Sequence, residues 1–196
     1  MRVNDLDLHP ASTALLLMDL QTGIIGSYPE AADVVERLVR ARASAREAGM
    51  TVGYVRVALT ADDVAAMPPT SRFAGAAASG GLDADAPSTQ IDERIAPAEG
   101  ELVVRKSRVG AFSTTDLRSQ LDARGIDTLV LAGVATSGVV LSTLRDAADR
   151  DYRILVLEDG CADRDQEVHR VLLEKVFPRQ ATVTTIDEFV AALTAS

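Results

Sequence analysis

The sequence has little of what marks disulfide-rich, membrane-spanning or nucleic-acid-binding proteins. Its one cysteine, Cys161, cannot form an internal disulfide. Lys and Arg number 20 against 29 Asp and Glu, and nucleic-acid binders instead need clustered cations. The longest strongly apolar run, residues 14–18, is too short to cross a bilayer, and the N-terminal segment lacks the basic flank and apolar core of a signal peptide. By elimination, we expect a cytoplasmic protein with no membrane or nucleic-acid partner.

The composition is that of a globular protein. Hydrophobic residues make up 47% of the 196 residues and charged residues 25%, which is outside the range of disordered chains. The net charge of −9 is spread along the chain and indicates a solvated surface rather than an acidic tail. A chain of this length fits one medium domain, and we expect a single domain over residues 1–196.

Short apolar runs alternate with segments of helical periodicity. Helices are predicted to begin near Pro29 and end at Gly49, to begin at an N-cap on Ser113 and end at Gly125, and to cover residues 139–150, 167–176 and 187 onward. The predicted strands are residues 14–18, 51–57, 102–105, 128–132, 154–157 and 181–184. This alternation predicts an α/β fold with three layers (α/β/α) and a largely parallel, Rossmann-like sheet of six strands.

The pattern dissolves between residues 58 and 100. This stretch holds four of the seven prolines and an Ala/Gly-rich run, so it is predicted to be mostly loop, with a short helix near Ile91. Loops of this length within a compact domain are usually functional covers or interface arms. A linker between two domains is the alternative, but the same alternation resumes afterwards without a second core.

Three features are predicted to meet at one edge of the sheet. Asp19 ends the first strand, Lys106 follows the third, and the segment 133–138 (GVATSG) leads from the fourth strand into a helix. Ligands of open parallel sheets bind beyond the carboxyl ends of the strands, and the N–H groups of such a turn can hold an oxyanion or a carboxylate. An Asp after a strand often only caps a turn and a Lys there is often solvated. Their joint placement nevertheless favours a catalytic site.

Several segments resemble one enzyme family. This sequence is similar to the isochorismatase-like (cysteine hydrolase) superfamily in three blocks and in a fourth segment, which is followed by His169. The similar segments occur in the same order and cover nearly the whole chain. The blocks are residues 17–21 (LMDLQ), Lys106 with 108–112 (RVGAF), and 133–136 (GVAT) with 143–147 (TLRDA); the fourth segment is 158–163 (EDGCAD).

The resemblance implies an isochorismatase-like hydrolase fold and specific site residues. The catalytic Asp of the family falls on Asp19 and its catalytic Lys on Lys106, whereas its nucleophilic Cys falls on Val139, which has no nucleophilic atom. The remaining candidates are pocket residues: Ala135, Thr136, Gly138 and Val139 in the turn, and Gln21, Arg108, Phe112, Arg72 and Phe73 for substrate binding.

No other residue is a strong replacement for the thiol. Cys161 follows a different strand and is expected to be a small buried hydrophobe. Hydroxyls near the turn have no histidine in the motif to act as a base. His9 belongs to the N-terminal arm, and His169 is expected to serve packing or helix hydrogen bonding. The hydroxyl-bearing candidates are Ser137, Ser142 and Thr143.

We predict no metal and no other cofactor. Nicotinamidases of this superfamily use an Asp/His/His cluster after the second strand, but residues 56–70 contain Asp62 and Asp63 and no histidine. Two adjacent carboxylates are a poor zinc or iron site, so nicotinamidase activity is not expected. The glycine-rich runs contain neither a phosphate loop nor a GxGxxG motif.

The chemistry that remains is proton transfer. Without the thiol an amidase of the usual family kind is not expected, and we predict a hydrolase acting on a small carboxylated or carbonyl-bearing metabolite through Asp19 and Lys106. One reaction that the resemblance offers is isochorismatase-type chemistry, in which the Asp protonates a vinyl-ether carbon and water attacks the cation. The turn 135–138 (ATSG) differs from the aromatic and His residues of true isochorismatases, so the substrate stays open. Val139 dries the pocket and raises the Asp19 pKa while Lys106 lowers it, so acid and base roles both stay open.

Two further expectations follow from the resemblance. Family members are commonly dimers or tetramers, which implies a homodimer or homotetramer. The alternative to an enzyme is a non-catalytic relative that binds a small molecule in the same pocket, although the joint presence of Asp19 and Lys106 favours catalysis.

Overall fold

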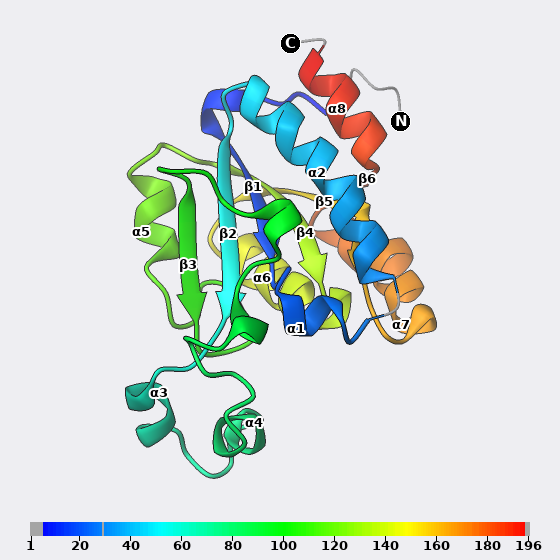
Figure 1. Ribbon diagram of the computed structural model, residues 1–196. Coiled ribbons are helices and arrows are strands. Elements are labelled where there is room, and N and C mark those ends of the chain that lie inside the picture. The colour runs from blue at the N-terminus through cyan, green and yellow to red at the C-terminus, as the bar shows by residue number, and fades with distance from the viewer. Residues whose placement is uncertain (1–5, 29, 195–196) are drawn as a thin grey trace.

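The computed structural model describes residues 6–28 and 30–194 and has one parallel sheet of six strands at its centre (Figure 1). The order is β3-β2-β1-β4-β5-β6, and every neighbouring pair is parallel. The predicted α/β fold is confirmed. The strands are β1 (Thr13–Met18), β2 (Thr51–Val57), β3 (Leu102–Lys106), β4 (Thr128–Val134), β5 (Arg153–Ala162) and β6 (Thr182–Thr184).

Strand β1 is central because its sequence is apolar on both faces. All six of its residues are buried, as expected of a strand covered by helices on each side. From β1 the chain first builds β2 and β3 to one side and later β4, β5 and β6 to the other. The order therefore reverses between β1 and β4, and this switch point is where ligands of such sheets bind.

Helices cover both faces of the sheet (Figure 1). Leu15 and Leu17 of β1 belong to a core shared with α2 and α8, whereas Leu16 and Met18 belong to the core shared with α5 and α6. Successive residues of β1 thus belong to opposite cores, because their side chains alternate between the two faces of the sheet. The six helices nearest the sheet are α1 (Thr22–Ile25), α2 (Ala31–Glu47), α5 (Leu117–Asp122), α6 (Leu141–Ala148), α7 (Gln166–Val171) and α8 (Ile186–Thr194).

Shorter helical turns complete the chain. Four are 3-10 turns and two are π-helical turns, the latter directly before α6 and directly after α7. The 3-10 turns are Pro10–Ser12, Pro87–Thr89, Glu93–Ile95 and Phe177–Arg179, and the π turns are Thr136–Val140 and Leu172–Val176. In the described ranges, none of the helices has both the length and the apolar character needed to span a membrane.

Some predicted boundaries differ from the structure. The N-cap predicted at Ser113 is wrong: its hydroxyl donates to the Gly110 carbonyl, and α5 begins only after Asp116. Gly49 and Gly125 follow α2 and α5 with φ of 76° and 66°, the left-handed conformation that suits glycine after a helix. The predicted helix start at Pro29 lies outside the described residues.

Residues 59–86 form a projection, here called the arm, which stands off the carboxyl edge of β2 and β3 (Figure 1). The prediction of mostly loop is wrong for two segments, α3 (Ala61–Ala65) and α4 (Ala74–Ala78). Alanine is the strongest helix former, and this outweighs the neighbouring glycines. The short helix predicted near Ile91 is the 3-10 turn Glu93–Ile95, outside the arm.

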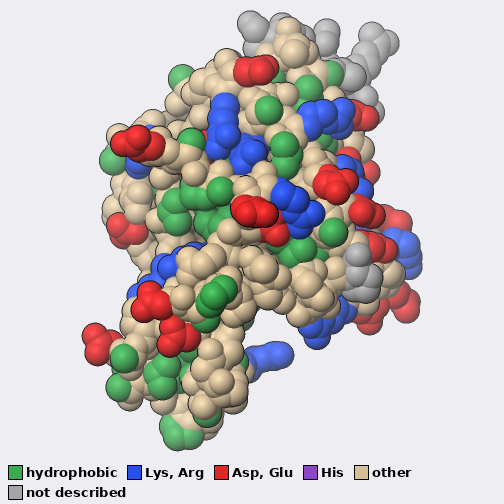
Figure 2. Space-filling view, viewed as in Figure 1, with side chains coloured by type: hydrophobic (Ala, Val, Ile, Leu, Met, Phe, Trp, Pro, Cys, Tyr) green, Lys and Arg blue, Asp and Glu red, His purple; other side chains and the backbone are tan. Residues whose placement is uncertain are grey.

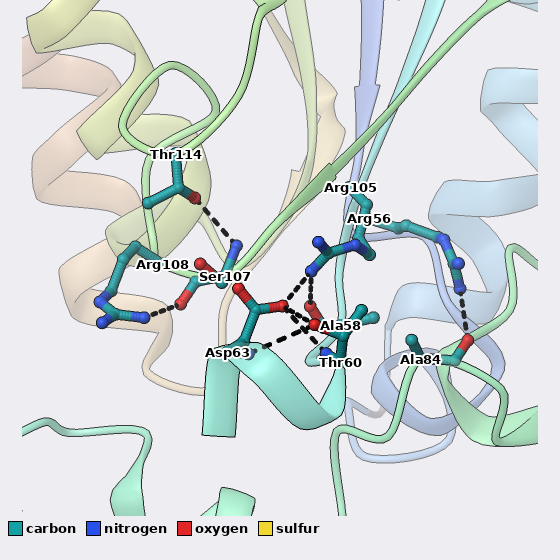
Figure 3. Close-up of polar contacts among 9 residues, drawn as sticks. All are labelled: Arg56, Ala58, Thr60, Asp63, Ala84, Arg105, Ser107, Arg108 and Thr114. Atoms are coloured by element: carbon teal, nitrogen blue, oxygen red, sulfur yellow. Dashed lines mark hydrogen bonds and ion pairs between the residues drawn. The ribbon is translucent and has the colours of Figure 1, made fainter. Parts of the chain in front are cut away.

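Two arginines of the sheet hold the base of the arm (Figure 3). Arg105 pairs with the Asp63 carboxylate and donates to the Ala58 carbonyl, while Arg56 donates to the Ala84 carbonyl. Asp63 also closes a capping box with Thr60 at the start of α3. The attachment is therefore polar and lies at the base of the arm.

Candidate active site

Asp19 occupies the switch point of the sheet. It directly follows β1 with φ of 55°, a left-handed conformation that Asp tolerates better than most residues, and its N–H donates to the Val55 carbonyl at 2.8 Å. Beside it, Gly133 has φ of 143°, and a Cβ there would lie 2.1 Å from the Met18 carbonyl oxygen. The ends of β1 and β4 thus approach so closely that position 133 requires glycine.

Lys106 is the last residue of β3 rather than the first after it, and its side chain is 1% exposed. Its Nζ lies 2.8 Å from Asp19 Oδ2 and 3.2 Å from the Arg108 carbonyl oxygen. Both members of the pair are buried, since Asp19 is also only 6% exposed. Removing either partner would leave an uncompensated buried charge, so the two side chains form one unit.

Burial raises the pKa of Asp19 to about 6. The charge and hydrogen bond of Lys106 lower it, but they do not offset the loss of water around the carboxylate. Oδ2 accepts from Lys106, whereas Oδ1 has no hydrogen-bond partner among the described residues. The sequence left open whether burial or Lys106 dominates the pKa of Asp19. Burial outweighs Lys106, and the carboxyl titrates near pH 6.

A pocket of about 290 Å³ opens onto the pair. Lys106 and Asp19 are its buried polar groups, and Val139 contributes an apolar surface at the position where the family resemblance places a cysteine. Phe73 reaches the pocket from the arm. The complete lining is Asp19, Gly23, Ile24, Ser27, Tyr28, Val57, Phe73, Lys106, Val109, Val134, Ala135, Gly138, Val139 and Arg164.

The turn before α6 is held from outside the pocket. It follows a cis peptide between Val134 and Ala135 and forms the π-helical turn Thr136–Val140. Thr136 is fully buried and its Oγ1 lies 2.8 Å from Nδ1 of His169 in α7. The Ser137 N–H donates to Asp163 Oδ2 at 2.7 Å. The predicted turn residues Ala135, Gly138 and Val139 line the pocket, whereas Thr136 supports the turn.

Two predicted substrate-binding residues have other partners. The Gln21 amide donates to the carbonyls of Val57 and Thr89 at 2.9 and 2.7 Å and accepts from the Val57 N–H at 2.8 Å. It therefore joins the ends of β1 and β2 to the 3-10 turn at residue 89. The Arg108 guanidinium donates to the Ser107 carbonyl and is not among the pocket-lining side chains (Figure 3).

Two further predicted pocket residues lie elsewhere. Phe112 is buried and stacks on Tyr152 with ring centroids 5.9 Å apart. It belongs to the core shared with α5 and α6 instead of the pocket. Arg72 is exposed on the arm and is not part of the lining. Phe73, its neighbour in sequence, is the predicted residue of the arm that does line the pocket.

Two of the alternative nucleophiles, Cys161 and Thr143, are poorly suited to that role. Burial raises the pKa of the Cys161 thiol to about 12, so almost no thiolate forms near neutral pH. The Thr143 hydroxyl is buried and accepts from the Ala111 N–H at 3.1 Å. His169, the nearest histidine to the turn, has its Nδ1 engaged by Thr136, and burial lowers its pKa.

Sequence reasoning did not single out several residues of the site, among them Tyr28, Asp163 and Arg164. Tyr28 and Arg164 line the pocket, with the Arg164 guanidinium carbon 4.7 Å from the centre of the Tyr28 ring. Asp163 supports the turn through Ser137. Asp163 and Arg164 directly follow β5 at the carboxyl edge of the sheet, so the rule that singled out Asp19 and Lys106 could have found them. Nothing in the sequence marks Tyr28.

Asp62 and Asp63, the two acids considered above as possible metal ligands, do not form a metal site. Asp63 caps α3 and pairs with Arg105, which lowers its pKa. Across residues 6–28 and 30–194, no group of three His, Cys, Asp or Glu side chains is arranged to hold a metal ion. The absence of a cofactor stays a prediction.

The fold and the position of the buried acid–base pair place the chain in the class of α/β enzymes with a site at the sheet's switch point. Comparison with known proteins identifies the family: residues 13–188 match the isochorismatase domain, and the chain belongs to the isochorismatase family. It is a hydrolase of that family.

Individual relatives span nearly the whole chain. The uncharacterized isochorismatase family protein YecD of Escherichia coli O157:H7 is 32% identical over 96% of this chain and 100% of its own length. The ureidoacrylate amidohydrolase RutB of Variovorax paradoxus is 32% identical over 96% of this chain and 84% of its own. Among solved structures, a cysteine hydrolase from Pseudomonas syringae pv. phaseolicola superimposes with a TM-score of 0.87 at 25% identity, covering 96% of this chain and 95% of the other.

Proposed function

We propose that this hydrolase acts on a small carboxylated or carbonyl-bearing metabolite by proton transfer through Asp19, without a covalent enzyme intermediate. The observation that carries the proposal is the state of Asp19, a buried carboxyl whose pKa is raised to about 6. A catalytic acid or base works best when its pKa lies near the working pH. Burial has brought this carboxyl close to that range although a lysine lies 2.8 Å away.

The acid step fits the hydrolysis of a vinyl ether. Protonated Asp19 donates its proton to the terminal alkene carbon, which leaves a cation stabilised by the ether oxygen. Water adds to that cation, and the resulting hemiketal separates into a carbonyl compound and an alcohol. The proton lost by the water returns to Asp19. Throughout, Lys106 stays beside Oδ2 and stabilises the carboxylate that forms when Asp19 donates its proton.

The lining of the pocket supports a route without a covalent intermediate. Val139 offers no nucleophilic atom, and the lining contains no thiol and no imidazole among the described residues. The lining has two hydroxyl-bearing residues, Ser27 and Tyr28, and the Ser27 hydroxyl donates to the Gly23 carbonyl at 2.8 Å. Ionised Asp19 could in turn act as a base on water, which is the step an amide or ureido substrate would need.

Substrate screening with an Asp19 variant tests the proposal. Isochorismate, ureido acids and simple amides are the compounds to assay; ureido acids are included because of the similarity to a ureidoacrylate amidohydrolase. For any compound that turns over, Asp19→Asn should lower kcat on the order of a hundredfold or more. The matched control is Asp149→Asn, an exposed residue after α6, which should leave kcat unchanged.

Two results would contradict the proposal. Full activity of Asp19→Asn on the identified substrate would remove the carboxyl from the mechanism. Ligand-induced thermal shifts without turnover of any of the compounds would instead support a small-molecule-binding relative.

A further inference from the structure

We propose that His169 is a positioning residue for the pocket, because it holds the turn before α6 in place through Thr136. Its role in turnover rests on the proposed function, whereas its effect on the turn can be measured without a substrate. The two side chains meet in a hydrogen bond, with Thr136 Oγ1 2.8 Å from His169 Nδ1. Neither side chain belongs to the pocket lining, so both act on the pocket only through the turn.

Thr136 fixes the turn at a point outside the pocket. Ala135, Gly138 and Val139 line the pocket, whereas Thr136 is fully buried. The Ala135 carbonyl accepts from the N–H groups of Gly138 and Val140 at 3.1 and 3.3 Å, so the residues on either side of Thr136 are tied to each other. A shift of the Thr136 side chain would therefore move the lining residues with it.

The imidazole of His169 is the acceptor of this hydrogen bond. Among the described residues, the Thr136 hydroxyl has no hydrogen-bond partner other than Nδ1, and a buried hydroxyl needs an acceptor for its proton. The hydroxyl therefore donates to Nδ1, which assigns the imidazole hydrogen to Nε2. Burial lowers the pKa of His169 and keeps the ring uncharged at neutral pH, although the nearby carboxylates oppose this shift. These carboxylates are Asp163, Glu30 and Glu158.

Helix α7 reaches the turn through this ring. None of the residues of α7 is buried, so the helix lies at the surface, and His169 is its half-buried side chain. The same segment after β5 also supplies Asp163, which accepts from the Ser137 N–H at 2.7 Å. The segment thus holds the turn at two successive residues, at the side chain of Thr136 and at the backbone of Ser137.

A thiol placed in the turn reports its position without a substrate. Val139→Cys supplies this thiol, and the start of a helix lowers a thiol pKa only when its N–H groups point at the sulfur. In this background, His169→Leu should raise the thiol pKa toward that of an ordinary cysteine. Alkylation by iodoacetamide at pH 7 should then slow on the order of tenfold. Because the imidazole is uncharged at this pH, the change cannot come from a lost charge.

Further variants separate the hydrogen bond from a general loss of packing. His169→Asn keeps an acceptor oxygen at the δ position and should retain most of the reactivity of the Val139→Cys protein. Thr136→Val removes the hydroxyl at nearly constant volume and should raise the thiol pKa as His169→Leu does, with no further rise when the two are combined. The matched control is Arg170→Gln: Arg170 is exposed on α7 and pairs with Glu174, so the thiol pKa should not change.

Three results would overturn the proposal. They are an unchanged thiol pKa in Thr136→Val or His169→Leu, an equal rise in His169→Asn and His169→Leu, and an ordinary thiol pKa in Val139→Cys alone. Thermal unfolding identifies the variants that fold, and Thr136→Val decides the question if His169→Leu does not. None of these results depends on turnover, so full activity of Asp19→Asn would refute the proposed function and leave the role of His169 in the turn standing.

Discussion

At the scale of single residues, Asp19 is the residue to which the proposed function assigns proton transfer. Its backbone turns away from β1 in a left-handed conformation, and its side chain lies buried with one oxygen on Lys106 and the other without a partner among the described residues. These features come from its position rather than from the residue type alone. An exposed Asp would titrate near 4 and would carry no proton at neutral pH.

The first prediction concerns the titration of Asp19. Its carboxyl carbon, followed by ¹³C NMR, should titrate near pH 6, and Lys106→Met should move the midpoint higher because the cation that lowers the pKa is gone. If Asp19 is the acid, kcat should fall as the pH rises through about 6; if it is the base, kcat should rise there. A midpoint near 4 in the wild type would show that the carboxyl is not desolvated.

The raised pKa of Asp19 also determines how its contribution to the free energy of unfolding changes with pH. The folded protein holds the Asp19 proton more tightly than the unfolded chain, whose pKa is about 3.8. The contribution of Asp19 to the free energy of unfolding is therefore fully present below pH 4 and is lost as the pH rises through about 6. This opposes the behaviour of Asp63, whose lowered pKa makes its contribution present above pH 4 and lost on acidification.

The second prediction concerns the apolar residue beside the acid. Val139→Cys would place a thiol in the π-helical turn before α6, in the lining shared with Lys106, and this thiol should titrate below an ordinary cysteine. Alkylation by iodoacetamide as a function of pH measures it. The wild type is the control, because its one cysteine, Cys161, is buried and should react very slowly. An unreactive thiol at position 139 would mean that the pocket is assigned wrongly.

At the scale of elements, the close approach of β1 and β4 sets the geometry of the site. Gly133→Ala should destabilise the protein by more than about 3 kcal/mol or prevent folding, because the added Cβ meets the Met18 carbonyl at 2.1 Å. Gly49→Ala is the matched control: this glycine also has positive φ but no atom within 4 Å of the added Cβ, so it should cost on the order of 1–2 kcal/mol. Urea unfolding of both variants gives the comparison, and equal losses would contradict it.

An element could be predicted from the sequence where the residues that determine it lie close together in the chain. Short apolar or β-branched runs placed all six strands, and the strand ends placed Asp19 and Lys106 at one edge, because these signals lie within a few residues of chain. The start of α5 and the role of Phe112 could not be predicted, since the first depends on a loop contact and the second on a ring 40 residues away. Thr136 and His169 likewise meet only in the folded protein.

At the scale of the whole molecule, the arm differs from the rest. It projects from the carboxyl edge of the sheet, and a notch separates it from the body in Figure 2. Its helices α3 and α4 are five residues each, and none of their residues is buried. With so little buried surface, the arm should open locally at a lower free energy than the sheet and its helices.

Limited proteolysis tests this difference. Trypsin should cut the folded protein first after Arg72, which is exposed between α3 and α4, and should leave fragments 1–72 and 73–196 detectable by mass spectrometry. Arg72→Gln removes this site and should delay the first cut without changing the thermal unfolding midpoint. Initial cleavage at an arginine of α2 or α5 would show that the arm is not the least stable part.

The arm also contributes Phe73 to the pocket, while the proposed proton-transfer groups, Asp19 and Lys106, come from the ends of β1 and β3. The two contributions belong to segments whose stability is determined separately, one by the core and the other by contacts at the arm's base. Changes within the arm can therefore accumulate at little cost to folding and alter which molecules enter the pocket. A scaffold of this kind can acquire a new substrate while its proton chemistry is inherited unchanged.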